Sequence, residues 1–341
     1  MTDFFETIRS YNCEYLPHQK CVSANTLKSH KNALNVFVSY LRQEKKLHID
    51  KITFAIIDRQ VVIDFLQWLV DTREISPRSR TQRLSILRTF FGYAGEIDCT
   101  NVALEQQIKK IPMGRHQGKI VEYLSDKALK TLLEQPNTKR LNGQRDRFFM
   151  SLMYDTAARV SELLDLKICD IKIGTEHPVA YLRGKGGKTR CVPIMPKTVE
   201  HCKGYMRVFH PNFDPTSADN LFYTNLHNEK HRLTAAAVGK FFRKYGEWAR
   251  LVCPEVPERV HAHQLRHTRA IHLYRDGYPL VLVGEYLGHV NPETTKVYAY
   301  ADSEMKRKAL EQADMVHGDA SGEVAMWENN EEMILRLCGL K

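Results

Sequence analysis

The sequence lacks long apolar runs. No stretch approaches the roughly 18 consecutive apolar residues that a membrane-spanning helix requires. The first residues also lack the basic segment and apolar core that mark a secretory signal. These absences argue against a membrane or exported protein. We therefore expect a cytoplasmic protein that does not associate with a membrane.

The cysteines lack the spacing of a disulfide framework or a zinc site. The chain has eight cysteines and no C-x-x-C pair, and it is too long and too poor in cysteine for a disulfide scaffold. His261 and His263 form a close pair, but no cysteine or second histidine cluster lies at zinc-site spacing. We predict reduced thiols and no metal site.

The charge balance favours a polyanionic partner. The chain has 341 residues, enough for two domains, and its 50 Lys and Arg outnumber its 40 Asp and Glu. The formal net charge is +10 and the pI is about 9.1. Such a balance is typical of nucleic-acid-binding proteins, but by itself it does not identify the partner.

The first hundred residues are predicted to form amphipathic helices. Ser23 is a plausible N-cap, and Ser76-Pro77 is a cap followed by a proline at the first helical position. Arginines interleave with the apolar positions of this last helix, at Arg78, Arg80, Arg83 and Arg88. By helical phase they flank the apolar stripe. They either contact a phosphate backbone or are solvated charges with buried stems.

A segment with proline, glycines and basic residues follows these helices. It has little to bury, which is typical of an interdomain linker. Arg115 and Lys119 within it suit contacts with DNA. The expected divisions are a helical domain at 1–110, a linker at 111–122, a second domain at 123–317 and a tail helix at 318–341.

The second domain is predicted to contain one β-hairpin among helices. Apolar segments at 179–182 and 191–194 flank Gly184-Lys185-Gly186-Gly187-Lys188. The glycines indicate a tight turn with lysines near its tip. Helices are expected on both sides, from Ser125 to about residue 315. The predicted fold is mainly α with a small β-sheet, an α+β protein.

Arg159 is an oddly placed cation. It follows two alanines at the start of a predicted helix and precedes apolar residues, so we expect it to be partly buried. A buried arginine needs an anion or hydrogen-bond acceptors, and its guanidinium fits two phosphate oxygens at once. Glu162, one turn later, can orient it. A purely structural Arg–Glu pair is the alternative.

A second cationic pair lies at His263 and Arg266. Residues three apart share one face of a helix, so the two side chains can present an acid/base and an anion clamp to one ligand. His267 and Arg269 are predicted to point elsewhere and to be structural or to contact the DNA backbone.

A histidine and a tyrosine follow near the end of the second domain. His289 comes directly after Gly288 at a predicted helix end, and Tyr298 lies nine residues further on. Most tyrosines of this kind are core residues. Tyr286 and Tyr300 compete with Tyr298 for any chemical role.

Taken together, these elements resemble the tyrosine recombinases, the lambda-integrase and Xer-like family of site-specific DNA recombinases. The matching positions, in family order, are Arg159 with Glu162, Lys185, His263 with Arg266, and Leu287-Gly288-His289 followed by Tyr298. The resemblance is strong over residues 120–315. It implies a two-domain, C-shaped clamp with a helical core-binding domain and a tyrosine-recombinase catalytic domain.

In this family a tyrosine attacks the scissile phosphodiester and forms a 3′-phosphotyrosine, leaving a free 5′-hydroxyl. The resemblance implies that Tyr298 is the nucleophile and that His263 accepts its proton. It implies that Lys185 protonates the departing 5′-oxygen, with Lys188 as the competing candidate.

The remaining matched residues are expected to surround the same phosphate. Arg159 and Arg266 would clamp its non-bridging oxygens, His289 would donate to it, and Glu162 would hold the site in shape. Such a set of cations makes a metal ion unnecessary, so we predict no metal and no small-molecule cofactor.

The resemblance also implies partners. We expect double-stranded DNA recombination sites, a monomer without DNA and a homo-tetramer on paired sites, with strand exchange through a Holliday junction. The tail helix at 318–341 is expected to dock on a neighbour or on its own domain. Integration, excision or transposition of a mobile element is the predicted role. Xer-like dimer resolution and DNA relaxation of the type IB topoisomerase kind are the alternatives.

Overall fold

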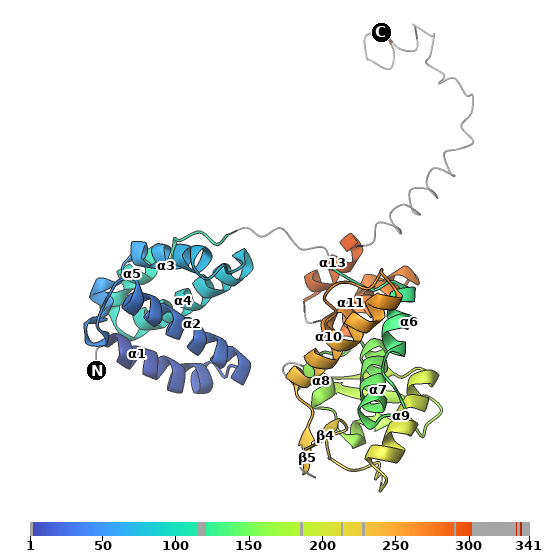
Figure 1. The fold of residues 1–341 in the computed structure, drawn as a ribbon. Coiled ribbons are helices and arrows are strands. Elements are labelled where there is room, and N and C mark those ends of the chain that lie inside the picture. Colours follow the sequence, from blue (N-terminus) through green and yellow to red (C-terminus); the bar gives the residue numbers. More distant parts are fainter. Residues whose placement is uncertain are drawn as a thin grey trace. The chain divides into compact units, whose positions relative to one another are not determined.

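The computed structural model describes residues 3–114, 121–184, 187–212, 214–226, 229–289 and 291–301, together with Glu332 and Leu335. The chain forms two compact units, residues 1–118 and 119–341, each with its own hydrophobic core (Figure 1). The predicted tail helix at 318–341 falls outside the described residues except at those last two positions. The predicted clamp arrangement of the domains stays a prediction.

The regular elements of the first unit are all helices over the residues that are described. Its elements are α1 (Asp3–Ser10), the π-helix η1 (Tyr11–Gln19), α2 (Ala24–Gln43), η2 (Ile49–Lys51), η3 (Phe54–Ile56), α3 (Arg59–Asp71), α4 (Pro77–Ile97), η4 (Cys99–Asn101) and α5 (Val102–Lys109). Within the described residues of the whole chain, no helix has the length and apolar character needed to cross a membrane.

Side-chain caps determine where the long helices of this unit begin. Ser23, Asp58 and Ser76 each accept a hydrogen bond from the backbone N–H three residues later. Such caps satisfy donors that a helix leaves unpaired in its first turn. Pro77 occupies the first position of α4, as predicted. The expected helix starts at Ser23 and Ser76 are therefore confirmed.

Aromatic rings fill the core of the first unit. Buried rings from α1, η1, α2, α3 and α4 pack edge to face or tilted, among them Phe4, Tyr11, Phe37, Phe65, Phe90 and Phe91. Ile111 is also buried in this core. The first unit therefore extends past residue 110, where we had expected the linker to begin.

The second unit combines helices with two small antiparallel sheets. Its elements are α6 (Asp126–Glu134), α7 (Leu141–Thr156), α8 (Val160–Leu164), η5 (Ile168–Asp170), β1 (Ile171–Lys172), β2 (Val179–Arg183), β3 (Thr189–Pro193), α9 (Pro196–Phe209), β4 (Tyr223–Leu226), β5 (Glu229–Arg232), α10 (Ala235–Val252), α11 (Ala262–Arg275), α12 (Leu280–Leu287) and α13 (Glu293–Ala301).

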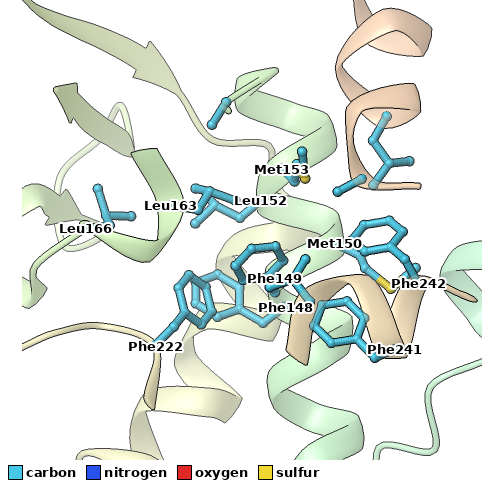
Figure 2. Packing of buried hydrophobic residues seen from close by; sticks show 14 of the residues in the cluster. Phe148, Phe149, Met150, Leu152, Met153, Leu163, Leu166, Phe222, Phe241 and Phe242 are labelled. Atoms are coloured by element: carbon cyan, nitrogen blue, oxygen red, sulfur yellow. The ribbon is translucent and has the colours of Figure 1, made fainter. Parts of the chain in front are cut away.

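Helix α7 runs through the centre of this unit. Most of its residues are buried, so it has no solvent stripe and behaves as a core helix. Figure 2 shows Phe148 and Phe149 of α7 facing Phe222 and Phe241. The ring centroids of Phe149 lie 4.9 Å from Phe222 and 5.7 Å from Phe241. The C-terminal end of α7, which leads into the site, is thereby fixed.

The predicted β-hairpin is confirmed. Strand β2 pairs antiparallel with β3 from Val179↔Pro193 to Arg183↔Thr189, and β1 adds a third strand. The backbone N–H of Gly184 donates to the carbonyl of Lys188 at 2.8 Å, which closes the turn. A second hairpin, β4–β5, was not predicted. All four residues of β5 are exposed, so no apolar alternation marks it.

Helix α10 approaches the start of α11 closely at Gly246. A Cβ built there would lie 2.6 Å from Val260 Cβ, whereas one at Gly239 on the same helix would meet nothing within 4 Å. We predict that Gly246→Ala destabilises the chain by about 1–3 kcal/mol through overpacking. Gly239→Ala should instead stabilise it by about 0.5–1 kcal/mol, because alanine favours helix.

Urea denaturation of the two variants measures this difference. Equal effects of the two substitutions would contradict the close packing of α10 against Val260.

Candidate active site

Two left-handed residues bring the ends of α7 and α12 toward α11. Ala157 ends α7 with φ 47°, and Gly288 ends α12 with φ 66°. A left-handed residue reverses the chain and leaves the last carbonyls of the helix without helical partners. Two of these freed carbonyls, at Ala157 and Leu287, accept hydrogen bonds from Arg266.

Arg266 of α11 is a buried cation with only 1% of its surface exposed. Its Nη1 donates to the carbonyl of Ala157 at 2.7 Å and its Nη2 to the carbonyl of Leu287 at 2.8 Å. Burial, and then the nearby Arg159, lower the pKa of Arg266 to about 10. The guanidinium therefore stays charged at neutral pH. The predicted anion clamp is anchored to backbone on two sides.

Arg159 lies directly before α8 and contacts Glu162, as the sequence indicated. Its Nη1 donates to Glu162 Oε1 and its backbone N–H donates to Glu162 Oε2, both at 2.8 Å. The Arg159 side chain is 37% exposed, whereas that of Glu162 is 4% exposed. Arg159 thus keeps donors facing solvent while one end of its guanidinium is held.

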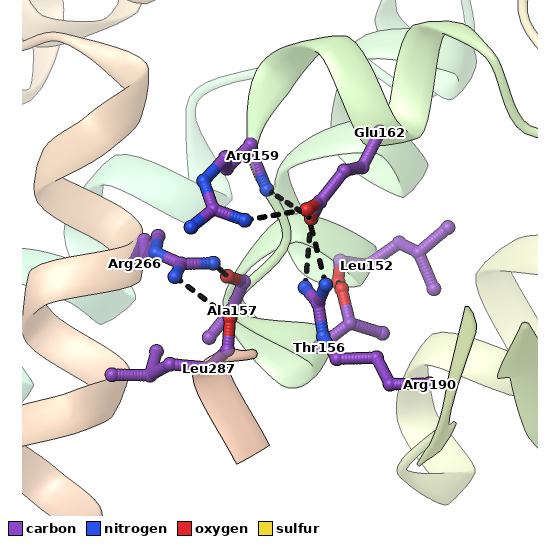
Figure 3. A network of polar contacts seen from close by, with 8 residues as sticks. All are labelled: Leu152, Thr156, Ala157, Arg159, Glu162, Arg190, Arg266 and Leu287. Atoms are coloured by element: carbon purple, nitrogen blue, oxygen red, sulfur yellow. Dashed lines mark hydrogen bonds and ion pairs between the residues drawn. The ribbon is translucent and has the colours of Figure 1, made fainter. Parts of the chain in front are cut away.

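A second arginine on the same carboxylate was not predicted. Arg190 of β3 donates from Nη1 to Glu162 Oε1 at 3.0 Å and from Nη2 to Glu162 Oε2 at 2.7 Å. Figure 3 shows Glu162 between the two guanidinium groups, with Arg266 directed toward Ala157 and Leu287. Most residues of β3 are exposed, so nothing in the sequence distinguishes Arg190 from a surface cation. Only the folded chain places it against Glu162.

Glu162, Arg159 and Arg190 together carry a net positive charge. Burial would raise the pKa of Glu162, but hydrogen bonds from Arg190 and from the Arg159 backbone outweigh it, and the pKa is lowered. One carboxylate therefore faces two guanidinium groups. An anion entering beside Arg159 meets positive charge that the protein has not neutralised.

Tyr298 of α13 lies in a small core formed with α11 and α12. It is 2% exposed and packs with Ala270, Ile271, Val283 and Leu287. Burial raises the pKa of Tyr298, while the charges of Arg266 and Arg159 lower it in part. The phenol is therefore neutral in this state, but the same two arginines favour its ionised form.

The hydroxyl of Tyr298 contacts His267. Its oxygen lies 2.9 Å from His267 Nδ1. The prediction that His267 points away from the site is wrong. His267 is four residues after His263, and residues four apart share one helix face as those three apart do.

His289 is a second histidine beside the tyrosine. Its ring is nearly parallel to that of Tyr298, at 6.4 Å between centroids, and its Nδ1 is 2.8 Å from Thr295 Oγ1. Gly284 lets α12 approach Thr295, because a Cβ there would be 3.0 Å from Oγ1. Burial, and then Arg266 and Arg159, lower the pKa of His289 to about 4.

His263 is exposed near the start of α11. Its ring stands edge-on to that of His267, with centroids 4.5 Å apart. Although part of its surface is exposed, the surrounding protein partly desolvates the imidazole; this, and then the charge of Arg266, lower the pKa of His263. Among the described contacts the Tyr298 hydroxyl meets His267 and not His263. The expected transfer of the tyrosine proton to His263 therefore stays a prediction.

A pocket opens where these elements meet the β2–β3 hairpin. It is lined by Arg159, Gly184, Lys188, Thr189, Arg190, Gly288, His289, Asn291 and Thr294. Three of the predicted site residues, Arg159, Lys188 and His289, thus share one cavity. Lys185 lies outside the described residues.

The predicted DNA-binding arginines of α4 have different environments. Arg78 is exposed and lines a groove with polar side chains of α2 such as Asn25 and Ser29. Arg80 is half-buried, and Arg83 donates to Asn32 at 3.0 Å. Arg88 bonds the carbonyls of Lys109 and Ile111, which makes it structural. Arg115 and Lys119 fall outside the described residues.

The described part of the chain contains no group of three or more His, Cys, Asp or Glu side chains arranged to hold a metal ion. The predicted absence of a metal or cofactor is not tested by this observation.

Comparison with known proteins identifies the class. The phage integrase family matches residues 122–305, and its N-terminal SAM-like domain matches residues 9–96. The chain therefore belongs to the phage integrase family. It is a tyrosine recombinase, an enzyme that cleaves and rejoins DNA.

Relatives of similar length support this assignment. The chain is 28% identical over 318 residues to the integrase/recombinase y4rC of Sinorhizobium fredii, covering 92% of each chain. It is 28% identical over 307 residues to the tyrosine recombinase XerD of Staphylococcus haemolyticus, covering 90% of this chain and 98% of that one. The structure of XerH bound to difH in a post-cleavage complex is 24% identical with a TM-score of 0.66, over 90% of this chain and 87% of XerH. That likeness shows the fold.

We predict that Arg190→Ala destabilises the chain by about 3 kcal/mol, because it leaves the buried Glu162 carboxylate with one partner fewer. Arg183 on the same hairpin is the matched control. It pairs with Asp170 at 2.9 Å and is 59% exposed. Arg183→Ala should cost about 1 kcal/mol or less. Urea denaturation measures the loss of unfolding free energy in each variant. An equal loss in the two would show that Arg190 does not support Glu162.

We predict that stability without DNA falls as the pH is lowered from about 7 to about 4. The pKa values of His267 and His289 are lowered to about 4, whereas unfolded histidines titrate near 6.5. Between these values the unfolded chain binds more protons, so acid favours unfolding. The melting temperature should drop across this window, and less so in His289→Gln. An unchanged pH dependence in that variant would contradict the lowered pKa of His289.

Proposed function

We propose that this chain is a site-specific recombinase that integrates, excises or transposes a mobile element. It cleaves each strand through a 3′-phosphotyrosine on Tyr298 and exchanges strands through a Holliday junction. The observation that carries this proposal is the packing of Tyr298 with His267, His289 and Arg266 beside the pocket that Arg159 lines.

Arg159 and Arg266 supply the positive charge that stabilises the transition state. During attack the phosphate becomes pentavalent and its oxygens gain negative charge, which fixed cations stabilise. Arg159 faces the pocket with free donors, and Arg266 adds a buried charge behind it. Both charges also favour the ionised form of Tyr298. A phenol, almost fully protonated at neutral pH, becomes a better nucleophile in this field.

Proton transfers complete the step. As the Tyr298 oxygen bonds to phosphorus, its proton leaves toward His263. As the bond to the 5′-oxygen breaks, Lys185, which lies between β2 and β3 in the sequence, donates a proton to that oxygen. Lys188, which lines the pocket, is the competing donor. His289 donates to a non-bridging oxygen, and Glu162 keeps Arg159 in place.

DNA contacts extend beyond the active site. The α4 residues Arg78, Arg80 and Arg83, with Arg115, Lys119 and Lys188, would bind phosphates of the duplex. The XerH structure contains its difH DNA, and a lambda integrase structure is a tetramer on a Holliday junction. By analogy, four copies of this chain would assemble on two sites. The segment at 318–341 would dock on a neighbouring copy.

Dimer resolution is the second candidate role. The chain covers 98% of the XerD length, and XerD is among its matched relatives. The match to y4rC, named as an integrase/recombinase, is compatible with the mobile-element role. The DNA on which the enzyme acts in its host distinguishes the two. Sites at the junction of a chromosome or plasmid dimer would favour resolution, and element ends would favour integration.

We predict that wild-type protein, denatured rapidly from host cells, carries DNA covalently and that Tyr298→Phe does not. Removing the hydroxyl removes the nucleophile while the ring still packs. Tyr286→Phe is the matched control and should retain the adduct, since the Tyr286 hydroxyl bonds the carbonyl of Asp155. Sequencing the attached DNA gives the site. An adduct that persists in Tyr298→Phe would overturn the assignment.

A further inference from the structure

The proposed nucleophile, Tyr298, forms a direct pair with His267, a histidine that the sequence did not predict to face the site. His267 Nδ1 and the Tyr298 hydroxyl are 2.9 Å apart, and their ring centroids are 5.7 Å apart. Tyr298 is buried, and it does not line the pocket that Arg159 and His289 share. The hydroxyl is therefore oriented by His267 of α11, from outside this pocket.

The charges around His267 determine which partner holds the proton. His263, Arg266 and His261 face it from α11 and its N-cap, and His289 faces it from the end of α12. Burial, and then these groups, lower the pKa of His267 to about 4. Burial raises the pKa of Tyr298. Both groups are therefore neutral, and the proton stays on the tyrosine. With the His267 proton on Nε2, the phenol donates to Nδ1.

We propose that His267 is a positioning residue, which accepts a hydrogen bond from Tyr298 and holds this tyrosine in the site of its own chain before and during attack. This inference rests on the function proposed for Tyr298. His267 orients the Tyr298 oxygen. The proton that leaves when this oxygen bonds to phosphorus goes to His263, the acceptor proposed above. The order of bond making and breaking is unchanged.

Helix α11 also provides a matched control pair. His272 Nδ1 lies 2.8 Å from the Tyr154 hydroxyl, an imidazole–phenol contact of the same kind. His272 is buried at 8% exposure and lies outside the described pocket of Arg159. A general effect of removing a buried histidine from α11 would appear at both positions. A positioning effect on the nucleophile would appear only at His267.

The decisive experiment compares His267→Ala, His267→Asn and His272→Ala in the full chain. Asparagine places an amide oxygen near the position of Nδ1 and cannot take up a proton at neutral pH. The substrate is a nicked duplex with the sequence recovered from the wild-type adduct. The rate of adduct formation is measured at saturating DNA from pH 6 to 9, and DNA affinity is measured separately.

We expect His267→Ala to lower this rate by about tenfold or more at unchanged DNA affinity, because small misplacements of a reacting atom are costly. His267→Asn should restore the rate to within about threefold of wild type with the same pH profile, since it keeps the hydrogen bond. His272→Ala should leave the rate unchanged. Equal rates in His267→Ala and wild type, or a faster His267→Ala, would overturn the proposal.

His267→Asn separates positioning from proton transfer. If it is as slow as His267→Ala and loses the wild-type pH profile, His267 is the proton acceptor and the positioning role is wrong. A second readout needs no DNA. Nitration of Tyr298, located by mass spectrometry, should be faster in His267→Ala than in wild type or His267→Asn. Equal nitration in all three would contradict the hydrogen bond even if the proposed recombinase activity failed.

Discussion

The buried guanidinium of Arg266 constrains the arrangement of the whole catalytic unit. A charge with 1% exposure must find acceptors, and it finds them in the carbonyls of Ala157 and Leu287. Both carbonyls come from helix ends that left-handed residues terminate. Satisfying one cation therefore draws α7, α11 and α12 together. The residues that follow these ends, Arg159 and His289, are brought to one pocket as a result.

Excess positive charge in the site is what would stabilise an anionic transition state. Glu162 holds Arg159 and Arg190 but offsets only one of them, and Arg266 has neutral carbonyls as its partners. The site is thus organised before any substrate arrives, which is the condition under which fixed charges stabilise a transition state most effectively. Burial, and then the same charges, lower the pKa of His289. The charges also make the buried phenol of Tyr298 more acidic than burial alone would.

Sequence reasoning identified the parts of the site that follow helical spacing or a turn. The Arg159–Glu162 contact and the β2–β3 hairpin were predicted and are present. Arg190 was missed because a cation on a short, mostly exposed strand has no distinguishing pattern. His267 was missed by a phase argument that neglected the equivalence of three- and four-residue spacing. Strand β5 has no apolar alternation, because all four of its residues are exposed. Of these, only the pairing of Arg190 with Glu162 joins residues far apart in the chain, which spacing does not encode.

The proposed chemistry depends on a covalent bond between Tyr298 and DNA. Tandem mass spectrometry of the trapped complex tests it most directly, because the tryptic peptide from Val297 to Lys306 contains both Tyr298 and Tyr300. We expect a nucleotide 3′-phosphate on Tyr298, with Tyr300 unmodified. A nucleotide on Tyr300, or on a peptide other than this one, would contradict it.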